Sequence, residues 1–189
     1  MRETDQFSAR AVTLDPGDSR VWDDRALALL LLGRCNASLE ASDRAIQLDP
    51  YGTSAYQDRA WLMNMMGRPA EALPFADKAL LLDPSDGWWL RVACEAHLLL
   101  GQPEQTIAKC ERASGLDRDF IHHSFLAAAY ANAGDIEHAR SALQAMLETV
   151  PGYTIAQLKA KRYSDHPEYQ KLAERYWYDG LRKAGLAGR

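Results

Sequence analysis

The chain has 189 residues, of which 25% are charged and 47% hydrophobic, and its formal net charge at pH 7 is −4. This composition is typical of a soluble helical domain, and the acidic balance argues against nonspecific nucleic-acid binding, which needs clustered Lys and Arg. The longest apolar run, residues 26–32, is far shorter than the ~20 residues of a membrane-spanning helix. Since the N-terminus also lacks a secretory signal pattern, we expect a cytoplasmic protein with no nucleic-acid or membrane partner.

The first predicted helix, over residues 7–14, ends at the tripeptide Leu14-Asp15-Pro16. The same tripeptide returns twice, each time 34 residues further on, at 48–50 and 82–84. A glycine keeps this spacing too, at Gly33, Gly67 and Gly101, and Gly134 continues the series with one residue lost. Gly ends a helix in a left-handed cap, and Pro cannot continue a helix past the next boundary. Each period is therefore predicted to hold two helices, with one turn at Gly and the next at Asp-Pro.

Four pairs of helices follow in chain order. Their predicted bounds are 19–32 with 36–48, 54–66 with 69–82, 88–100 with 103–114, and 121–133 with 136–149. A fixed 34-residue period made of two short helices resembles the tetratricopeptide repeat (TPR), in which each unit buries its apolar face by stacking on its neighbours. The resemblance implies an all-α fold, a right-handed superhelix of antiparallel helix pairs, with four units over residues 19–151.

The residues expected at the helix crossings support this resemblance. The first helices carry a large residue followed four positions later by a small one, as in Trp22 with Ala26 and Tyr56 with Ala60. Small residues suit these places because helix axes cannot approach to about 8–10 Å with large side chains between them. Cys94 and Cys110 fall at such interior positions, so we expect both to be reduced packing residues without a redox or metal role.

The predicted helix over residues 7–14 has Ala11 where the later second helices also carry Ala. It therefore resembles the second helix of a unit whose first helix is missing, and residues 1–18 are predicted to be a partial repeat. This suggests that the chain is a piece of a longer protein, cut inside an array, or the product of a truncated reading frame. The incomplete unit would leave apolar surface that a second copy could cover, so we expect a possible homodimer through it.

After Pro151 the period fails, and two more helices are predicted, over 155–162 and 167–183. Aromatic residues dominate this segment, at Tyr163, Tyr169, Tyr176, Trp177 and Tyr178. An aromatic stripe at helical spacing is usually a packing face, so residues 152–189 are predicted to be capping helices and a tail that dock on the fourth unit. An aromatic box that binds a ligand is the competing interpretation.

The tail also carries a narrower resemblance. The stretches Ser164-Asp165-His166-Pro167-Glu168-Tyr169 and Asp179-Gly180-Leu181-Arg182-Lys183-Ala184-Gly185-Leu186 are similar to the C-terminal TPR region of bacterial class III adenylate/guanylate cyclase-like proteins. The resemblance covers the non-catalytic portion of that family, and the family's metal-binding aspartates and nucleotide motifs have no counterpart in this sequence. It implies a regulatory or scaffolding region of a bacterial signalling protein. The alternative is a stand-alone cytoplasmic TPR adaptor.

Catalytic and metal-binding patterns do not emerge from the sequence. It contains no Gly-rich phosphate loop, no paired Cys motif, no His-Glu-x-x-His and no Gly-x-Ser-x-Gly. The adjacent His122 and His123 would point about 100° apart on a helix, so they cannot share a ligand on one face. We therefore expect no enzyme, no cofactor and no metal, and an enzyme with an unrecognised site is the least favoured hypothesis.

What remains is a binding surface, because the first helices of stacked TPR units line a concave groove. Those of the family's groove positions that we expect to contact a partner are Arg20, Asp23, Gln57, Trp61, Asn64, Trp88, Arg91 and Glu95. The other groove positions are Leu27, Leu30, Ser54 and Leu98, together with Ile121, Ser124, Ala128 and Ala131 of the fourth unit, which are small and nearly featureless. Trp and Arg are the residue types that most often anchor protein interfaces, so we expect a protein or peptide partner, although inter-repeat packing explains either Trp equally well. Asp23 would repel a partner's C-terminal carboxylate, which argues against the clamp of chaperone-binding TPR proteins.

Overall fold

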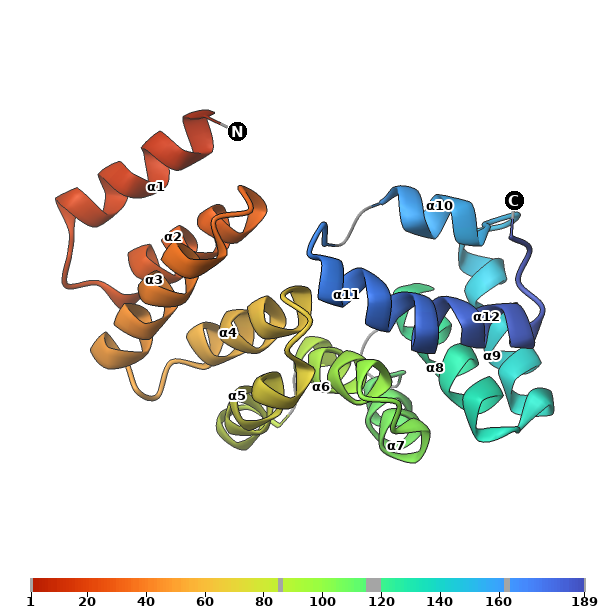
Figure 1. Cartoon of the computed structure of the whole chain (residues 1–189). Helices are drawn as coiled ribbons and strands as arrows, with labels where there is room; N and C mark the ends of the chain where they lie inside the picture. Colours follow the sequence, from red (N-terminus) through yellow and green to blue (C-terminus); the bar gives the residue numbers. More distant parts are fainter. Residues whose placement is uncertain (1, 85–86, 115–119, 162–163, 189) are drawn as a thin grey trace.

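The computed structural model describes residues 2–84, 87–114, 120–161 and 164–188, and every regular element in these ranges is a helix (Figure 1). In chain order the first nine are α1 (Arg2–Leu14), α2 (Ser19–Leu31), α3 (Cys35–Leu48), α4 (Thr53–Met65), α5 (Pro69–Leu82), α6 (Gly87–Leu99), α7 (Pro103–Ser114), α8 (Phe120–Ala133) and α9 (Ile136–Thr149). The predicted all-α fold is confirmed. From residue 19 to residue 149, each predicted helix bound lies within one residue of the observed bound, whereas α1 begins five residues earlier than predicted.

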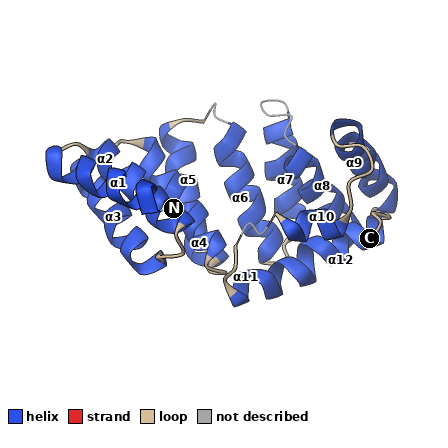
Figure 2. Ribbon diagram, turned by 90° about the horizontal axis from the view of Figure 1, so that it is seen from above, coloured by secondary structure: helices blue, strands red, loops and turns tan. Residues whose placement is uncertain are grey.

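The helices α2 to α9 pack as antiparallel pairs, and the pairs stack side by side into a curved array with α1 at one end (Figures 1 and 2). The turn inside each pair forms because a glycine follows the first helix. Gly33, Gly67 and Gly101 have φ values of 71°, 70° and 68°, a left-handed conformation that strains a residue with a Cβ. The N–H of the next residue then bonds back across the cap, as in Arg34 N to Leu29 O at 2.8 Å.

The 34-residue period also specifies hydrogen bonds between neighbouring pairs. Arg25 Nη1 donates to the carbonyl oxygen of Asp5 at 2.9 Å. Both positions recur 34 residues later, where Arg59 Nη1 donates to the carbonyl oxygen of Leu39 at 2.7 Å. The helix α1 therefore contacts α2 in the way that α3 contacts α4.

One prediction about the core is wrong. Cys94 of α6 and Cys110 of α7 form a disulfide instead of remaining reduced, and their Cα atoms lie 5.4 Å apart, within the usual range for such a bond. The two residues occupy the small-residue positions at which the helices of one pair cross, so their side chains meet in the interior. The spacing that made both residues suitable for packing also made them suitable for pairing. Cys35 is the remaining free cysteine.

The chain after α9 folds back over the array. It forms α10 (Ile155–Ala160), α11 (Pro167–Leu172), the π-helix η1 (Ala173–Tyr178) and α12 (Asp179–Ala184). The single helix predicted over 167–183 thus has a π-helical centre, which its sequence pattern did not indicate. The continuous rod of α11, η1 and α12, which we call the C-terminal rod, lies across the α4, α6 and α8 side of the array (Figure 1). The predicted docking on the fourth unit describes η1 and α12, which contact α8, whereas α11 contacts Gly67 and Glu95 of the second and third units.

Candidate protein-binding site

The predicted groove residues come from three neighbouring helices but have different surroundings. Arg20 is exposed at the first turn of α2, where its guanidinium pairs with Asp18 at 2.6 Å. Trp88 belongs to α6, but its side chain lies outside the described residues. The predicted residues that are buried are Asp23, Gln57, Asn64, Arg91 and Glu95, and Trp61 is half-buried.

The C-terminal rod occupies the groove at Asn64 and Glu95. The Tyr169 hydroxyl of α11 donates to Glu95 Oε1 at 3.1 Å. The Asn64 amide donates to the carbonyl oxygen of Val92 at 3.0 Å and approaches Glu95 Oε2 at 3.5 Å. Asn64 is completely buried and Glu95 nearly so. These two predicted binding residues are therefore already engaged with each other and with the chain's own tail.

The electrostatics of Glu95 are those of an interior group. Burial raises the pKa of its carboxyl group, and the raising effect exceeds the opposite effects of the Arg91 guanidinium, the Tyr169 hydroxyl and the Asn64 amide. A buried carboxylate is tolerable only when it is paired and hydrogen-bonded. Arg91 and Tyr169 supply those interactions from α6 and α11, so the polar residues of the predicted groove join the rod to the array.

Further along the rod, the contacts with α8 are apolar and close. Trp177 of η1 stacks edge-on against Phe125, with ring centroids 4.9 Å apart, and its Nε1 donates to Ser124 Oγ at 3.1 Å. A Cβ added to Gly180 of α12 would lie 2.7 Å from the carbonyl oxygen of Ala128, so the two backbones touch directly. The small, featureless groove positions of the fourth unit are thus the surface on which α12 rests.

The rod is an integral part of the core. Tyr169, Ala173 and Leu181 have no exposed surface, and Trp177 is 1% exposed. Burying one large apolar side chain contributes about 1.5–3 kcal/mol. Burial of Tyr169, Trp177 and Leu181 therefore stabilises the docked rod by several kcal/mol. In the structure the rod therefore covers the concave face between α4 and α8.

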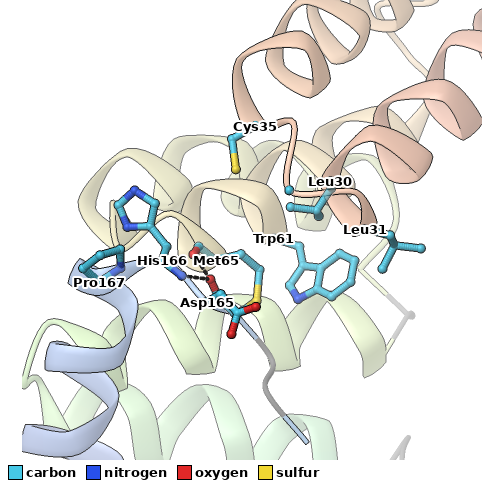
Figure 3. A pocket seen from close by; sticks show the side chains of 10 residues that line it. Leu30, Leu31, Cys35, Trp61, Met65, Asp165, His166 and Pro167 are labelled. Carbon is cyan, nitrogen blue, oxygen red and sulfur yellow. Dashed lines mark hydrogen bonds between the residues drawn. The ribbon is translucent and has the colours of Figure 1, made fainter. Parts of the chain in front are cut away.

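The concave face remains open at its α2–α4 end. A pocket of about 410 Å³ lies there (Figure 3), and we call it the α2–α4 pocket. Its walls are Leu30, Leu31, Gly33 and Cys35 from the first pair, Trp61 and Met65 from α4, and residues 164–167 before α11. Leu31 is 64% exposed. Two groove positions predicted from the repeat, Leu30 and Trp61, line this pocket.

Sequence reasoning missed most of this pocket. Leu31 and Cys35 are not groove positions of the repeat, and the wall formed by residues 164–167 exists only because the rod folds back over α4. The Ser164 hydroxyl fixes that wall by donating to the carbonyl oxygen of Met65 at 2.5 Å. The signals for this pocket in the sequence were the groove positions Leu30 and Trp61.

Three carboxyl groups lie beyond the pocket along the same two helices: Asp23 and Asp24 of α2 and Asp58 of α4. Burial raises the pKa of Asp58 to about 7, and the charges of Asp23 and Asp24 act in the same direction. Burial also raises the pKa of Asp23. Within residues 2–84, 87–114, 120–161 and 164–188, none of these three carboxyl groups forms a salt bridge. This end of the groove is thus locally acidic.

No helix in the described part of the chain combines the length and apolar character needed to cross a membrane. The same part of the chain brings no group of three or more His, Cys, Asp or Glu side chains together in an arrangement that could hold a metal ion.

No family model matches the chain, and no curated protein matches it in sequence. Solved structures do match. The crystal structure of YrrB, described as a TPR protein with an unusual peptide-binding site, has a TM-score of 0.67 at 22% identity and covers 94% of this chain and 90% of its own. TTC0263, a thermophilic TPR protein in Thermus thermophilus, has a TM-score of 0.67 at 19% identity, with coverage of 89% and 88%. MamA from Desulfovibrio magneticus RS-1 has a TM-score of 0.69 at 18% identity, with coverage of 78% and 84%. At these identities the likeness shows the fold, which is that of TPR proteins.

Proposed function

We propose that this chain is a non-catalytic protein-interaction domain that binds a segment of a partner protein at the α2–α4 pocket. The observation that carries the proposal is the uneven use of the concave face: the C-terminal rod fills it from α4 to α8 and leaves it open at α2. An exposed Leu31 beside a half-buried Trp61 is the kind of apolar anchor point that protein interfaces cover. The peptide-binding site named for YrrB supports a peptide or protein as the ligand class.

A stand-alone cytoplasmic adaptor fits these observations better than a region of a cyclase-like signalling protein. The resemblance to cyclase-like tails rests on residues 164–169 and 179–186. In the structure both stretches have structural roles within this chain. Residues 164–167 form a wall of the α2–α4 pocket, and Gly180 lets α12 pack on α8. The solved structures named above are not described as cyclases. The cyclase context therefore stays a prediction from the sequence.

The predicted homodimer also stays a proposal. Phe7 and Leu14 of α1 are 71% and 75% exposed, and a second copy of α1 could cover them. Sedimentation velocity of the chain and of a Phe7→Ser variant tests this surface. We expect a concentration-dependent dimer that the substitution abolishes, and a monomer at all concentrations would contradict the proposal.

Site-specific photo-cross-linking tests the proposed function. A photoreactive amino acid is placed at Leu31, beside the pocket, or at Leu81 of α5, which is also exposed near the end of a helix. The full chain is expressed in its source cell and irradiated. We expect a discrete adduct with one partner protein from position 31 and none from position 81. Equal adducts from both positions, or none from either, would contradict a binding function at this end of the groove.

A further inference from the structure

The repeat symmetry of the chain identifies the α2–α4 pocket as one member of a row of equivalent sites. Gly33, Gly67 and Gly101 occupy the same place in successive units. At Gly67 an added Cβ would lie 2.6 Å from both Glu168 Cβ and Tyr169 N, and at Gly101 it would overlap the Tyr176 ring. At Gly33 an added Cβ would meet nothing within 4 Å. The rod therefore covers the second and third sites of the row and leaves the first one bare.

The walls of the sites correspond as well. Leu30, Leu31 and Trp61 of the open site lie 34 residues before Asn64, Met65 and Glu95. Those later residues are the ones that hold the rod, through the Tyr169 hydroxyl on Glu95 and the Ser164 hydroxyl on Met65. A segment from outside the array can therefore contact Leu30, Leu31 and Trp61 at the first site as residues 164–169 contact Met65 and Glu95 at the second.

The spacing along the rod matches the spacing of the units. The rod contacts Gly67 with residues 168–169 and Gly101 with Tyr176, so it advances by about seven residues from one unit to the next. Seven α-helical residues would span about 10 Å, close to the 8–10 Å that separates packed helix axes, although residues 173–176 of this stretch belong to the π-helix η1. A helix thus follows this row of glycines with one anchoring position per unit.

The rod itself stops one unit short of the first site. His166 has an extended backbone (φ −69°, ψ 126°), and α11 begins at Pro167. The chain before it runs along the pocket wall at residues 164–167 without filling the pocket (Figure 3). The row of glycine sites that the rod covers continues to Gly33 in the α2–α4 pocket, and the rod does not reach this first site.

We propose that the α2–α4 pocket binds a helix of a partner protein that continues the line of α11 and inserts one aromatic or large aliphatic side chain beside Trp61 and Leu31, with Lys or Arg residues flanking that anchor. This inference rests on the proposed function and names the chemistry of the partner. The helical form follows from the helix already present at the two equivalent sites, and the apolar anchor follows from the apolar walls.

The basic residues follow from charge complementarity. Asp58 is three residues from Trp61 on α4, about 4.5 Å along the axis, and Asp23 is seven residues from Leu30 on α2, about 10 Å. Asp23 is 8% exposed, its carboxyl group is hydrogen-bonded by the Ser54 side chain, and its Oδ1 has no hydrogen-bond partner. The neighbouring cations on α2 and its following turn are already paired: Arg20 with Asp18, and both Arg25 and Arg34 with Asp5. A cationic side chain from a partner would supply the missing counter-charge, and an acidic partner would be repelled.

The test selects short helical peptides from a phage-displayed library with the full chain as bait, and then uses synthetic copies of the enriched peptides as probes. Affinity is measured by fluorescence anisotropy. Cys35 gives a second readout, because it lines the pocket and is the free cysteine of the chain. A bound helix should slow its alkylation by iodoacetamide. Leu31→Asp alters the pocket, and Leu81→Asp is the matched control at an exposed leucine elsewhere.

We expect the enriched peptides to share an aromatic or large aliphatic residue flanked by Lys or Arg. Their affinity should fall roughly tenfold or more in Leu31→Asp, as for a central interface residue, remain unchanged in Leu81→Asp, and fall more modestly in Asp58→Asn. Cys35 should be protected in the complex. Circular dichroism of each variant checks that the helices are intact.

Enriched peptides that are acidic, that bind Leu31→Asp as well as the wild type, or that leave Cys35 reactive would overturn the inference while leaving the proposed function in place. Failure to enrich any peptide, together with no adduct from the photo-cross-linker at position 31, would refute both. If sedimentation shows a dimer and Cys35 becomes protected simply by raising the chain's own concentration, the occupant is a second copy, and the inference of a foreign helix is wrong.

Discussion

The tightness with which the C-terminal rod is held can be tested at Trp177. Its side chain is 1% exposed, stacks on Phe125 and donates a hydrogen bond to Ser124. Replacing Trp177 by Ala removes these contacts and leaves a cavity under η1, which for buried Trp typically costs about 3–5 kcal/mol. A chain of this size has a total stability of about 5–15 kcal/mol, so the substitution should remove a large fraction of it.

Urea denaturation followed by circular dichroism measures this cost. With a slope of about 2 kcal/mol per molar urea, a loss of about 3–5 kcal/mol lowers the midpoint by about 1.5–2.5 M. The control is Tyr51→Ala, which truncates an aromatic side chain that is 78% exposed in the turn before α4. Its midpoint should shift by no more than a few tenths of a molar, because surface substitutions usually change stability by less than about 0.5 kcal/mol.

The unfolding profile separates an integral rod from a detachable one. If the rod is part of the core, Trp177→Ala should lower a single cooperative transition. If the rod were an exchangeable occupant of the groove, the variant would release it and leave the midpoint of the repeats unchanged, and trypsin would cut at Lys171 and Arg175 under native conditions. That second result would refute the closed groove and return Asn64 and Glu95 to the list of accessible binding residues.

Three further predictions concern groups inside the fold. Reduction of the Cys94–Cys110 disulfide, which closes a loop with a sequence separation of 16, should cost about 3 kcal/mol in urea unfolding. Tyr169→Phe should cost about 1–3 kcal/mol, because it leaves buried Glu95 without the hydroxyl donor, and a double-mutant cycle with Glu95→Gln should show coupling between the two positions. The pKa of Asp58 rises to about 7 on folding, so ionisation of this carboxyl group lowers the free energy of unfolding. This loss of stability is absent below about pH 4, grows between about pH 4 and 7, and is complete above that range. Asp58→Asn should therefore stabilise the chain at about pH 8 but not at about pH 4 in thermal melts.

The helices were predictable because their boundaries are local. Gly33 adopts a left-handed cap whatever packs around it, and Asp-Pro ends the following helix by its own chemistry. The accessible site was not predictable in the same way. Asn64 and Glu95 stand at groove positions, and only a residue far along the chain, Tyr169, shows that they face the interior. The disulfide was missed because the spacing of Cys94 and Cys110 is equally compatible with packing and with pairing.

The composition of the equivalent sites supports a partner at the open one. At the closed second site the three positions are Asn64, Met65 and Glu95, and the two polar groups among them could be hydrogen-bonded by water if nothing covered them. At the open first site the same three positions are Leu30, Leu31 and Trp61, which are all apolar. Exposing apolar surface to water costs about 25 cal/mol per Å². The more apolar of the two equivalent sites is thus the one that the C-terminal rod leaves uncovered. That distribution is unfavourable for an isolated domain and favourable for one that receives a helix from elsewhere.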